Sequence, residues 1–301
     1  MWIVKHRKIF YALIALITLA AVVSLFTWGL KLGIDFKGGA LLEVEYPVGR
    51  PVVELIKKNL STLSLGEFTV RPSGDIGYII RMRHLSEPER VAVTKALQNN
   101  GVKPVEKRFD SIGPLLGAEA VKKAYFSIVL VIIAIVLFIT FAFRHVSKPV
   151  SSWKYGIIAI VALVHDVVVP TGAFAALGYF YGFEVDTLFV TALLVILGFS
   201  IHDTIVVFDR VRENLRRNEQ YREHKDFDKI VGEGINQTFV RSINTSLTTL
   251  LALVALYMWG PDITRAFSLA LLIGITAGTY SSIFLASPLL VTVEKWQKKG
   301  K

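Results

Sequence analysis

The sequence contains no cysteine, comparatively few acidic residues and few charges altogether. The absence of cysteine excludes disulfide bonds as a source of stability. Charged residues make up 19% of the 301 residues, whereas hydrophobic residues make up 53%, and the mean hydropathy is +0.52. Because a soluble domain of this size is less apolar, the composition indicates a membrane protein.

Basic residues outnumber acidic ones by 34 to 24, which gives a formal net charge of +10. Such an excess can indicate a nucleic-acid partner. Here, however, much of it lies at the two ends of the chain and between 144 and 154, beside long apolar runs, while 210–233 mixes both signs. Basic residues that flank apolar runs are typical of proteins that contact membrane lipid, and they argue against nucleic-acid binding.

Six apolar runs are long enough to cross a bilayer as helices, for which about 20 residues are needed. They occupy residues 9–27, 124–143, 156–180, 188–208, 240–259 and 266–293. The first is long for a signal peptide, and no Ala-x-Ala cleavage pattern follows it, so we interpret it as a retained helix. The sequence therefore predicts an α-helical polytopic membrane protein with four parts: 1–30, the N-terminus and first span; 31–119, an inserted domain; 120–293, the other five spans; and 294–301, a basic tail.

The placement of lysine and arginine predicts the orientation. Basic clusters precede the first span, join the second span to the third and the fourth to the fifth, and end the chain. All four clusters fall on the cytoplasmic side if both termini are cytoplasmic. The insert 31–119 is then extracytoplasmic.

Within the insert, residue patterns predict strands at 41–46, 68–71, 78–83 and 102–109 and a helix at 52–63. Ser86 and Glu89 form a capping-box pattern that begins a second helix, which ends near Gly101. The order β-α-β-β-α-β predicts an α+β ferredoxin-like domain. It shows no paired catalytic acids and no metal-ligand spacing, so recognition or coupling is favoured over chemistry, with an inert spacer as the alternative.

The fourth span contains a single acidic residue, Asp203, with His202 beside it. An ionised carboxylate in the hydrocarbon core costs several kcal/mol unless it is paired, hydrated or protonated. Asp203 is therefore a candidate for a proton-coupling residue. The alternative is a carboxylate that hydrogen-bonds to a neighbouring helix for packing alone.

Arg241 opens the fifth span at a depth similar to that of Asp203, so the two are a plausible ion pair. Arg241 shares one helical face with the polar residues at 237, 244, 245 and 248, and such a face suits polar contacts or a hydrated path. Interhelical hydrogen bonding alone, or an Arg241 that reaches the headgroups, would also explain the pattern. The pair His165 and Asp166 lies deeper in the third span, where a proton relay and simple packing remain equally open.

Several separated motifs resemble those of the SecD/SecF protein-export family. The matching residues of GIDFKGG at 33–39 are Gly33, Asp35, Phe36, Gly38 and Gly39, and those of GPLLG at 113–117 are Gly113, Pro114 and Gly117. His165 with Asp166, Asp203 with Thr204, DRVREN at 209–214 (including Asp209 and Arg210) and NQTFVRSINT at 236–245 follow. Each is a modest signal alone, but in this order they are specific, and the six-span layout extends the resemblance over nearly the whole chain.

The resemblance implies an RND-superfamily membrane fold in the cytoplasmic membrane of a bacterium or archaeon. It also implies a partnership with SecD beside the SecYEG translocon, and use of the proton-motive force to assist export of a translocating preprotein. Asp203 and Arg241 match family positions linked to proton coupling. Two residues depart from the family pattern: His202 stands where Asn is frequent, and Ser242 stands where Thr is common. The resemblance implies neither an enzyme nor a cofactor.

Two other classes of function remain open. A small-molecule or lipid efflux transporter of the same superfamily would also need intramembrane acids, but such transporters usually carry larger, duplicated external domains. An intramembrane metallohydrolase could use His165, Asp166, His202 and Asp203. Neighbouring helical residues point about 100° apart, however, and the chain has no HExxH-type ligand pair, so we expect no metal site.

Overall fold

The computed structural model describes residues 2–98, 103–143 and 150–299. Contacts within the chain divide it into two compact units, 1–31 with 126–301, and 32–125. The sequence placed the insert at 31–119; in the structure, the start of the second long helix also belongs to the smaller unit.

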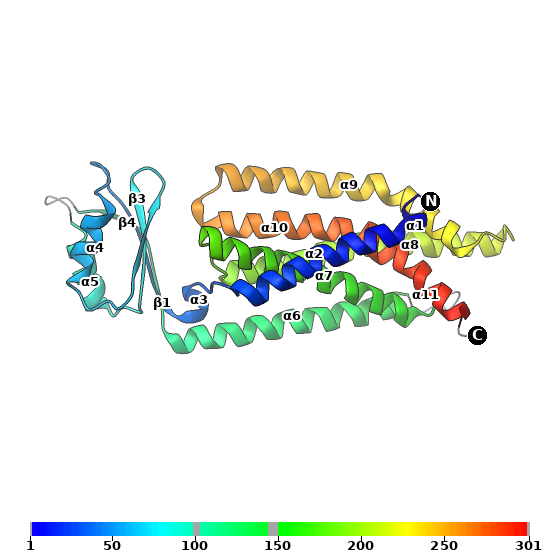
Figure 1. Cartoon of the computed structure of the whole chain (residues 1–301), viewed down its shortest axis with the longest axis horizontal. Helices are drawn as coiled ribbons and strands as arrows, with labels where there is room; N and C mark the ends of the chain where they lie inside the picture. The colour runs from blue at the N-terminus through cyan, green and yellow to red at the C-terminus, as the bar shows by residue number, and fades with distance from the viewer. Residues whose placement is uncertain (1, 99–102, 144–149, 300–301) are drawn as a thin grey trace. The chain divides into compact units, whose positions relative to one another are not determined.

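The larger unit contains the membrane-spanning helices, except for the start of the second, which belongs to the smaller unit. They are α2 (Arg7–Trp28), α6 (Pro114–Ala142), α7 (Ser152–Tyr181), α8 (Thr187–Gln220), α9 (Phe227–Trp259) and α10 (Asp262–Ser281). A short helix α1 (Trp2–Lys5) precedes them, and a π-helical segment η1 (Ser282–Ala286) joins α10 to α11 (Ser287–Lys299). In the described part of the chain, six helical segments are long and apolar enough to cross a membrane, as the sequence predicted. Helices α7, α8, α9 and α10 pack alongside one another, and α2 packs on α7 (Figure 1).

Two of the helices extend well beyond the apolar runs. The apolar run in α8 was predicted to end at 208, yet the helix continues to Gln220, and α9 begins at Phe227 rather than 240. The charged residues of this stretch favour helix, and ion pairs three residues apart, such as Arg210–Glu213 at 2.6 Å, support it. The residues 294–299 continue α11 rather than forming a separate tail.

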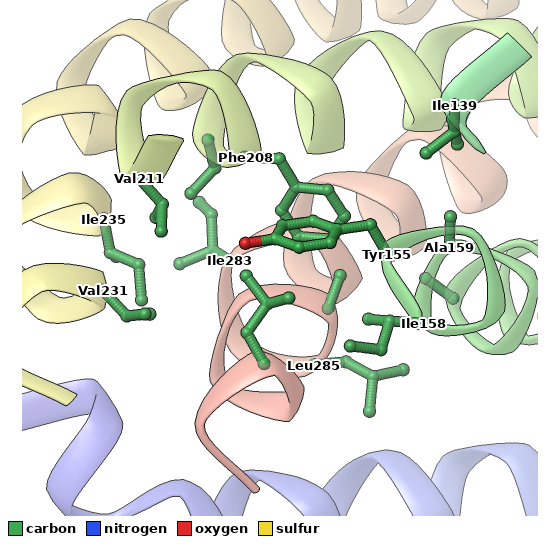
Figure 2. Packing of buried hydrophobic residues seen from close by; sticks show 14 of the residues in the cluster. Ile139, Tyr155, Ile158, Ala159, Phe208, Val211, Val231, Ile235, Ile283 and Leu285 are labelled. Carbon is green, nitrogen blue, oxygen red and sulfur yellow. The ribbon is translucent and has the colours of Figure 1, made fainter. Parts of the chain in front are cut away.

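A buried cluster at one end of the helix bundle centres on Tyr155 of α7. Its ring stacks on Phe143 at a centroid distance of 5.3 Å and meets Phe208 edge-on at 5.3 Å. Figure 2 shows the Tyr155 hydroxyl pointing toward aliphatic side chains, among them Val211 and Ile283. The hydroxyl oxygen is buried and has no hydrogen-bond partner in the described part of the chain.

The smaller unit has the ferredoxin-like arrangement. Its elements are α3 (Ile34–Lys37), β1 (Gly39–Glu45), α4 (Val53–Ser61), β2 (Thr69–Ser73), β3 (Gly77–Met82), α5 (Glu87–Ala96) and β4 (Val105–Ile112). The strands lie in the order β2-β3-β1-β4, and every neighbouring pair is antiparallel. This is the sheet that the predicted β-α-β-β-α-β order forms.

The edges of two elements in this unit differ from expectation. Strand β4 lies about three residues later than predicted, because it is a sheet edge whose residues are mostly half-buried, so no apolar alternation marks its ends. The expected end of the second helix near Gly101 lies outside the described residues, and α5 itself ends at Ala96. At its start, Glu89 Oε2 accepts a hydrogen bond from Ser86 N at 2.8 Å, as the capping-box pattern predicts.

Candidate functional site

Asp203 of α8 is buried within the bundle, with 7% of its surface exposed. Ser242 of α9 donates a hydrogen bond to its Oδ1 at 2.5 Å, and Ser282, the first residue of η1, donates to its Oδ2. Both donors are neutral hydroxyls. The carboxylate is thus held by hydrogen bonds from two other helical segments and has no cationic partner among the described residues.

A second buried carboxylate, Asp166 of α7, has no exposed surface. His165 Nδ1 lies 2.8 Å from its Oδ1. Ser200 of α8 and Ser281 of α10 both donate to its Oδ2, the latter at 2.9 Å. The structure therefore places the predicted residues His165 and Asp166 in one buried polar cluster and adds two serines to it.

Two glycines of α10 allow the close approach of α8 on which this cluster depends. A Cβ added to Gly278 would lie 2.9 Å from Ser200 Cβ, and one added to Gly274 would lie 2.1 Å from the Ile196 side chain. Larger residues would therefore separate the two helices. The Gly-x-x-x-Gly spacing serves to bring the hydroxyl-bearing faces together.

The structure does not form the ion pair expected between Arg241 and Asp203. Arg241 is exposed on the outer face of α9, whereas the next residue, Ser242, faces inward and binds Asp203. Adjacent residues on a helix point about 100° apart, so equal depth does not bring both to the same neighbour. His202 is exposed on α8 for the same reason.

The polar face predicted on α9 is present, but it faces away from the described part of the chain. Its exposed residues are Gln237, Arg241, Asn244, Thr245 and Thr248. Gln237 accepts from Asn214 Nδ2 at 3.1 Å, and Thr248 donates to the Thr245 carbonyl at 2.9 Å. Arg241 and Asn244 have no hydrogen-bond or ion-pair partner among the described residues.

The two glycine motifs meet inside the smaller unit. Gly38 has φ +74°, and a Cβ there would lie 2.8 Å from Pro114 Cα. A Cβ on Gly117 would lie 2.8 Å from the Phe36 carbonyl oxygen. Gly38 and Gly117 are therefore required by close backbone contact, and Gly38 also by its positive φ, whereas a Cβ on Gly113 would meet open space. This contact gives the glycines of both motifs a structural role.

The DRVREN segment lies on the part of α8 beyond the apolar run. Asp209 pairs with Arg212, and Arg210 pairs with Glu213, so both pairs support the helix. The Arg212 guanidinium also lies 5.6 Å from the centre of the Phe143 ring. These residues stabilise the helix end rather than contact either buried carboxylate.

Sequence reasoning named Ser242 only as a departure from the family pattern, and it missed the other three serines that hold the carboxylates: Ser200, Ser281 and Ser282. Serine is common in membrane helices and nearly neutral in hydropathy, so composition does not single it out. The consecutive serines at 281–282, in an apolar run, were the available signal. Within the described residues, no group of three or more His, Asp or Glu side chains could hold a metal ion.

Comparisons with known proteins bear on the family. A family model described as "Protein export membrane protein SecD/SecF, C-terminal" matches residues 92–296, and one described as "SecD/SecF GG Motif" matches residues 23–46. The chain belongs to the SecD/SecF family. The two SecD/SecF models between them include every motif on which the resemblance in the sequence rested.

Individual relatives and a solved structure support the same family membership. Protein translocase subunit SecF of Thermobaculum terrenum is 42% identical over 99% of this chain and 94% of its own length. Protein translocase subunit SecDF of Bacillus subtilis is 32% identical over 95% of this chain, which matches 37% of that protein. The crystal structure of SecDF, a translocon-associated membrane protein from Thermus thermophilus, superimposes with a TM-score of 0.81 at 30% identity, covering 97% of this chain and 38% of that one.

Proposed function

We propose that the chain is an auxiliary, non-enzymatic subunit of the Sec protein-export machinery, which works with SecD to assist translocation of preproteins at the expense of the proton-motive force. Membership of the SecD/SecF family and the names of its relatives support the export role. The observation that supports the proton-coupling role is the buried Asp203, a carboxylate inside a membrane-spanning helix whose partners among the described residues are hydroxyl groups.

Such a carboxylate is suited to taking up and releasing a proton. In the ionised form it accepts two hydrogen bonds, and in the neutral form it can donate one to a serine oxygen. No described cation holds it permanently ionised. A proton can therefore change its charge without leaving a polar group unpaired.

The test replaces Asp203 with Asn, which preserves shape and hydrogen-bonding capacity but does not titrate. We expect membrane vesicles that contain the variant, SecD and the SecYEG translocon to lose the stimulation of reporter-protein export by a proton gradient, while gradient-independent export persists. Asp203→Glu should retain part of the stimulation because the carboxyl group survives. The matched control is Asp228→Asn, which neutralises an aspartate paired with Lys295 at 3.2 Å, away from the site. Full gradient-dependent stimulation in Asp203→Asn would leave packing as the only role of this residue.

The proposed contact with SecD uses the polar face of α9. A membrane-spanning helix seldom presents an unpartnered arginine and asparagine to lipid, because these groups are costly there. Arg241 and Asn244 are the members of this face without a described partner. The SecDF relatives, which are much longer than this chain, support a second membrane unit as the cover.

Purification in mild detergent tests this contact. We expect SecD to copurify with the wild-type chain. The amount of SecD recovered per chain should fall when Arg241 and Asn244 are both changed to Leu. Leu251, exposed two turns further along α9, serves as the control when changed to Ala. Equal recovery of SecD with all three chains would place the interface elsewhere. The proton-coupling role that the family resemblance implies for Arg241 would then stand only if Arg241→Lys alters gradient-dependent export.

We propose further that the chain lies in the cytoplasmic membrane of a bacterium or archaeon with both termini cytoplasmic and the insert outside. The distribution of basic clusters supports this orientation. Because the chain has no cysteine, single cysteines can report it directly. An impermeant maleimide should label Ser61→Cys in intact spheroplasts and Gln220→Cys only after the membrane is opened; both positions are exposed. The reverse pattern would invert the proposed orientation.

A further inference from the structure

Two consecutive serines stand at the point where α10 becomes π-helical. Ser281, the last residue of α10, donates to Asp166 on α7, and Ser282, the first residue of η1, donates to Asp203 on α8. Because neighbouring helical residues point in different directions, one short stretch of chain reaches two carboxylates on two different helices. The two buried acids are thereby connected through two hydrogen bonds and two serines that a single peptide bond joins.

The π-helical segment holds the main chain of this serine pair in place. The carbonyl oxygen of Ser282 accepts a hydrogen bond from the backbone N–H of Ser287, five residues on, and a second from the Ser287 hydroxyl at 2.8 Å. Ser287 is fully buried. A π-turn inside an α-helical span is uncommon and often occurs at functional sites. Here it fixes Ser282 without using the hydroxyl that binds the carboxylate.

Each serine hydroxyl has a second acceptor within reach. Ser281 Oγ lies 3.1 Å from the Gly278 carbonyl oxygen, and Ser282 Oγ lies 3.0 Å from that of Thr279. A hydroxyl has one proton to donate. It donates to the carboxylate while that group is ionised. When the carboxyl takes up a proton, it can donate to the serine oxygen, and the serine proton turns to the helix carbonyl. The carboxyl gains one proton, the serine keeps its own, and no backbone movement is needed.

The two carboxylates are near enough to influence each other electrostatically. Their nearest oxygens are separated by no more than about 14 Å, the sum of two hydrogen bonds, two serine side chains and one Cα–Cα step of about 3.8 Å. Two negative charges at that distance inside a protein repel each other, and they repel more strongly if they are nearer.

Four other ionisable residues adjoin the cluster in sequence, on α7, α8, α9 and α10, and on α11 the buried Glu294 pairs with Lys298. His165 on α7 binds Asp166 directly, and its Nε2 is buried without a described partner. His202 on α8 and Arg241 on α9 are exposed, and the Tyr280 hydroxyl on α10 has no described partner. From α9, the inward-facing groups near the pair are the neutral Ser242 and Ser246.

We infer that Asp166 and Asp203 form one coupled proton-binding unit, in which Ser281 and Ser282 are the positioning residues that connect them. The inference rests on the proposed proton-coupling role of Asp203 and extends it to a second carboxylate. Two interacting acids release their protons in two steps that belong to the pair. The membrane core would therefore pass through a singly protonated state over a window of pH.

Infrared difference spectroscopy across a pH series tests the coupling. The sample is the chain with its SecD partner in lipid nanodiscs, and the C=O bands of the protonated carboxyls are assigned by Asp166→Asn and Asp203→Asn. Neutralising one carboxyl should shift the titration midpoint of the other's band in at least one of the two variants, because a neighbouring negative charge has been removed. Unchanged midpoints, or the absence of a titrating band for either residue, would overturn the inference.

Serine variants provide a second arm that leaves both carboxylates in place. Removing a hydrogen-bond donor changes the stability of the ionised carboxylate relative to the protonated one, so Ser282→Ala should shift the midpoint of the Asp203 band and Ser281→Ala that of the Asp166 band. Threonine at either position keeps the hydroxyl and should restore the midpoint. Ser268→Ala, which removes another buried hydroxyl of α10 bonded only to its own helix, should change neither band. Midpoints that stay fixed in both alanine variants would refute the positioning role.

The inference and the proposed function fail in different ways. Loss of gradient-dependent export in Asp203→Asn with no cross-effect between the two bands retains the function and rejects the coupling. Coupled titration together with full gradient-dependent export in Asp203→Asn retains the coupled pair and rejects its use in export.

Discussion

The unpartnered hydroxyl of Tyr155 gives a prediction that runs against the usual cost of core substitution. Tyr155→Phe keeps the ring, which stacks on Phe143 and meets Phe208 at 5.3 Å in each case, and removes only the hydroxyl. A buried hydroxyl without a hydrogen bond costs about 1–3 kcal/mol in proteins. Since no described group pairs with this one, we expect the substitution to raise the free energy of unfolding by about that amount.

The measurement is a titration of the purified chain with sodium dodecyl sulfate in mixed micelles, followed by tryptophan fluorescence. Tyr11→Phe is the matched control, because the Tyr11 hydroxyl lies 3.0 Å from Thr292 Oγ1 and its removal should lower stability by about 0.5–1.5 kcal/mol. Tyr155→Leu, which also loses the ring, should be destabilising by several kcal/mol, roughly as for other large-to-small core changes. If Tyr155→Phe destabilises as much as Tyr11→Phe, the hydroxyl has a partner, and the reasoning is wrong.

Three further predictions test other parts of the fold. Gly172→Ala should destabilise the chain by about 1–3 kcal/mol in the same titration, because the new Cβ would lie 2.4 Å from a backbone oxygen of α2; Gly198→Ala, with open space around its Cβ, should be neutral or stabilising. Gly117→Ala, whose Cβ would lie 2.8 Å from a backbone oxygen, should lower the thermal stability of the smaller unit, as seen by circular dichroism. The hydrogen bond from Arg83, aided by Ser86, lowers the pKa of Glu89 from 4.5 to about 2. The stabilisation is therefore present above about pH 4.5 and lost toward pH 2, and Glu89→Gln should flatten the dependence of melting temperature on pH in that window.

The sequence was sufficient for the architecture because each element carried its own signal. Length and hydropathy located six spans, and the alternation of strand and helix patterns in the insert specified the sheet order β2-β3-β1-β4. The ends of α8 and α9 were missed, since charged residues interrupt the apolar run without interrupting the helix. Apolar content defines where a membrane crossing lies, whereas helix propensity and ion pairs define where the helix stops.

The site was predicted only in part, because the depth of a residue along its helix does not determine which neighbouring helix its side chain faces. The position of Asp203 in an apolar run was enough to identify an unusual buried acid. The angular position of α9 relative to α8 depends on tertiary packing, and it brings Ser242 rather than Arg241 to that acid. The serines of α10 were likewise invisible to a reading of charge and hydropathy, although they complete both carboxylate clusters.

The contact between the two glycine motifs has a consequence for how this protein can change over evolution. Gly39, at the start of β1, pairs with Ile112, at the end of β4, so the chain enters and leaves the ferredoxin-like fold at adjacent points. A domain whose two ends lie close together can be enlarged, exchanged or removed without displacing the helices to which it is joined. A short Gly/Ser bridge in place of residues 40–111 should therefore leave a membrane unit that still folds, which would separate what the helices do from what the external domain adds.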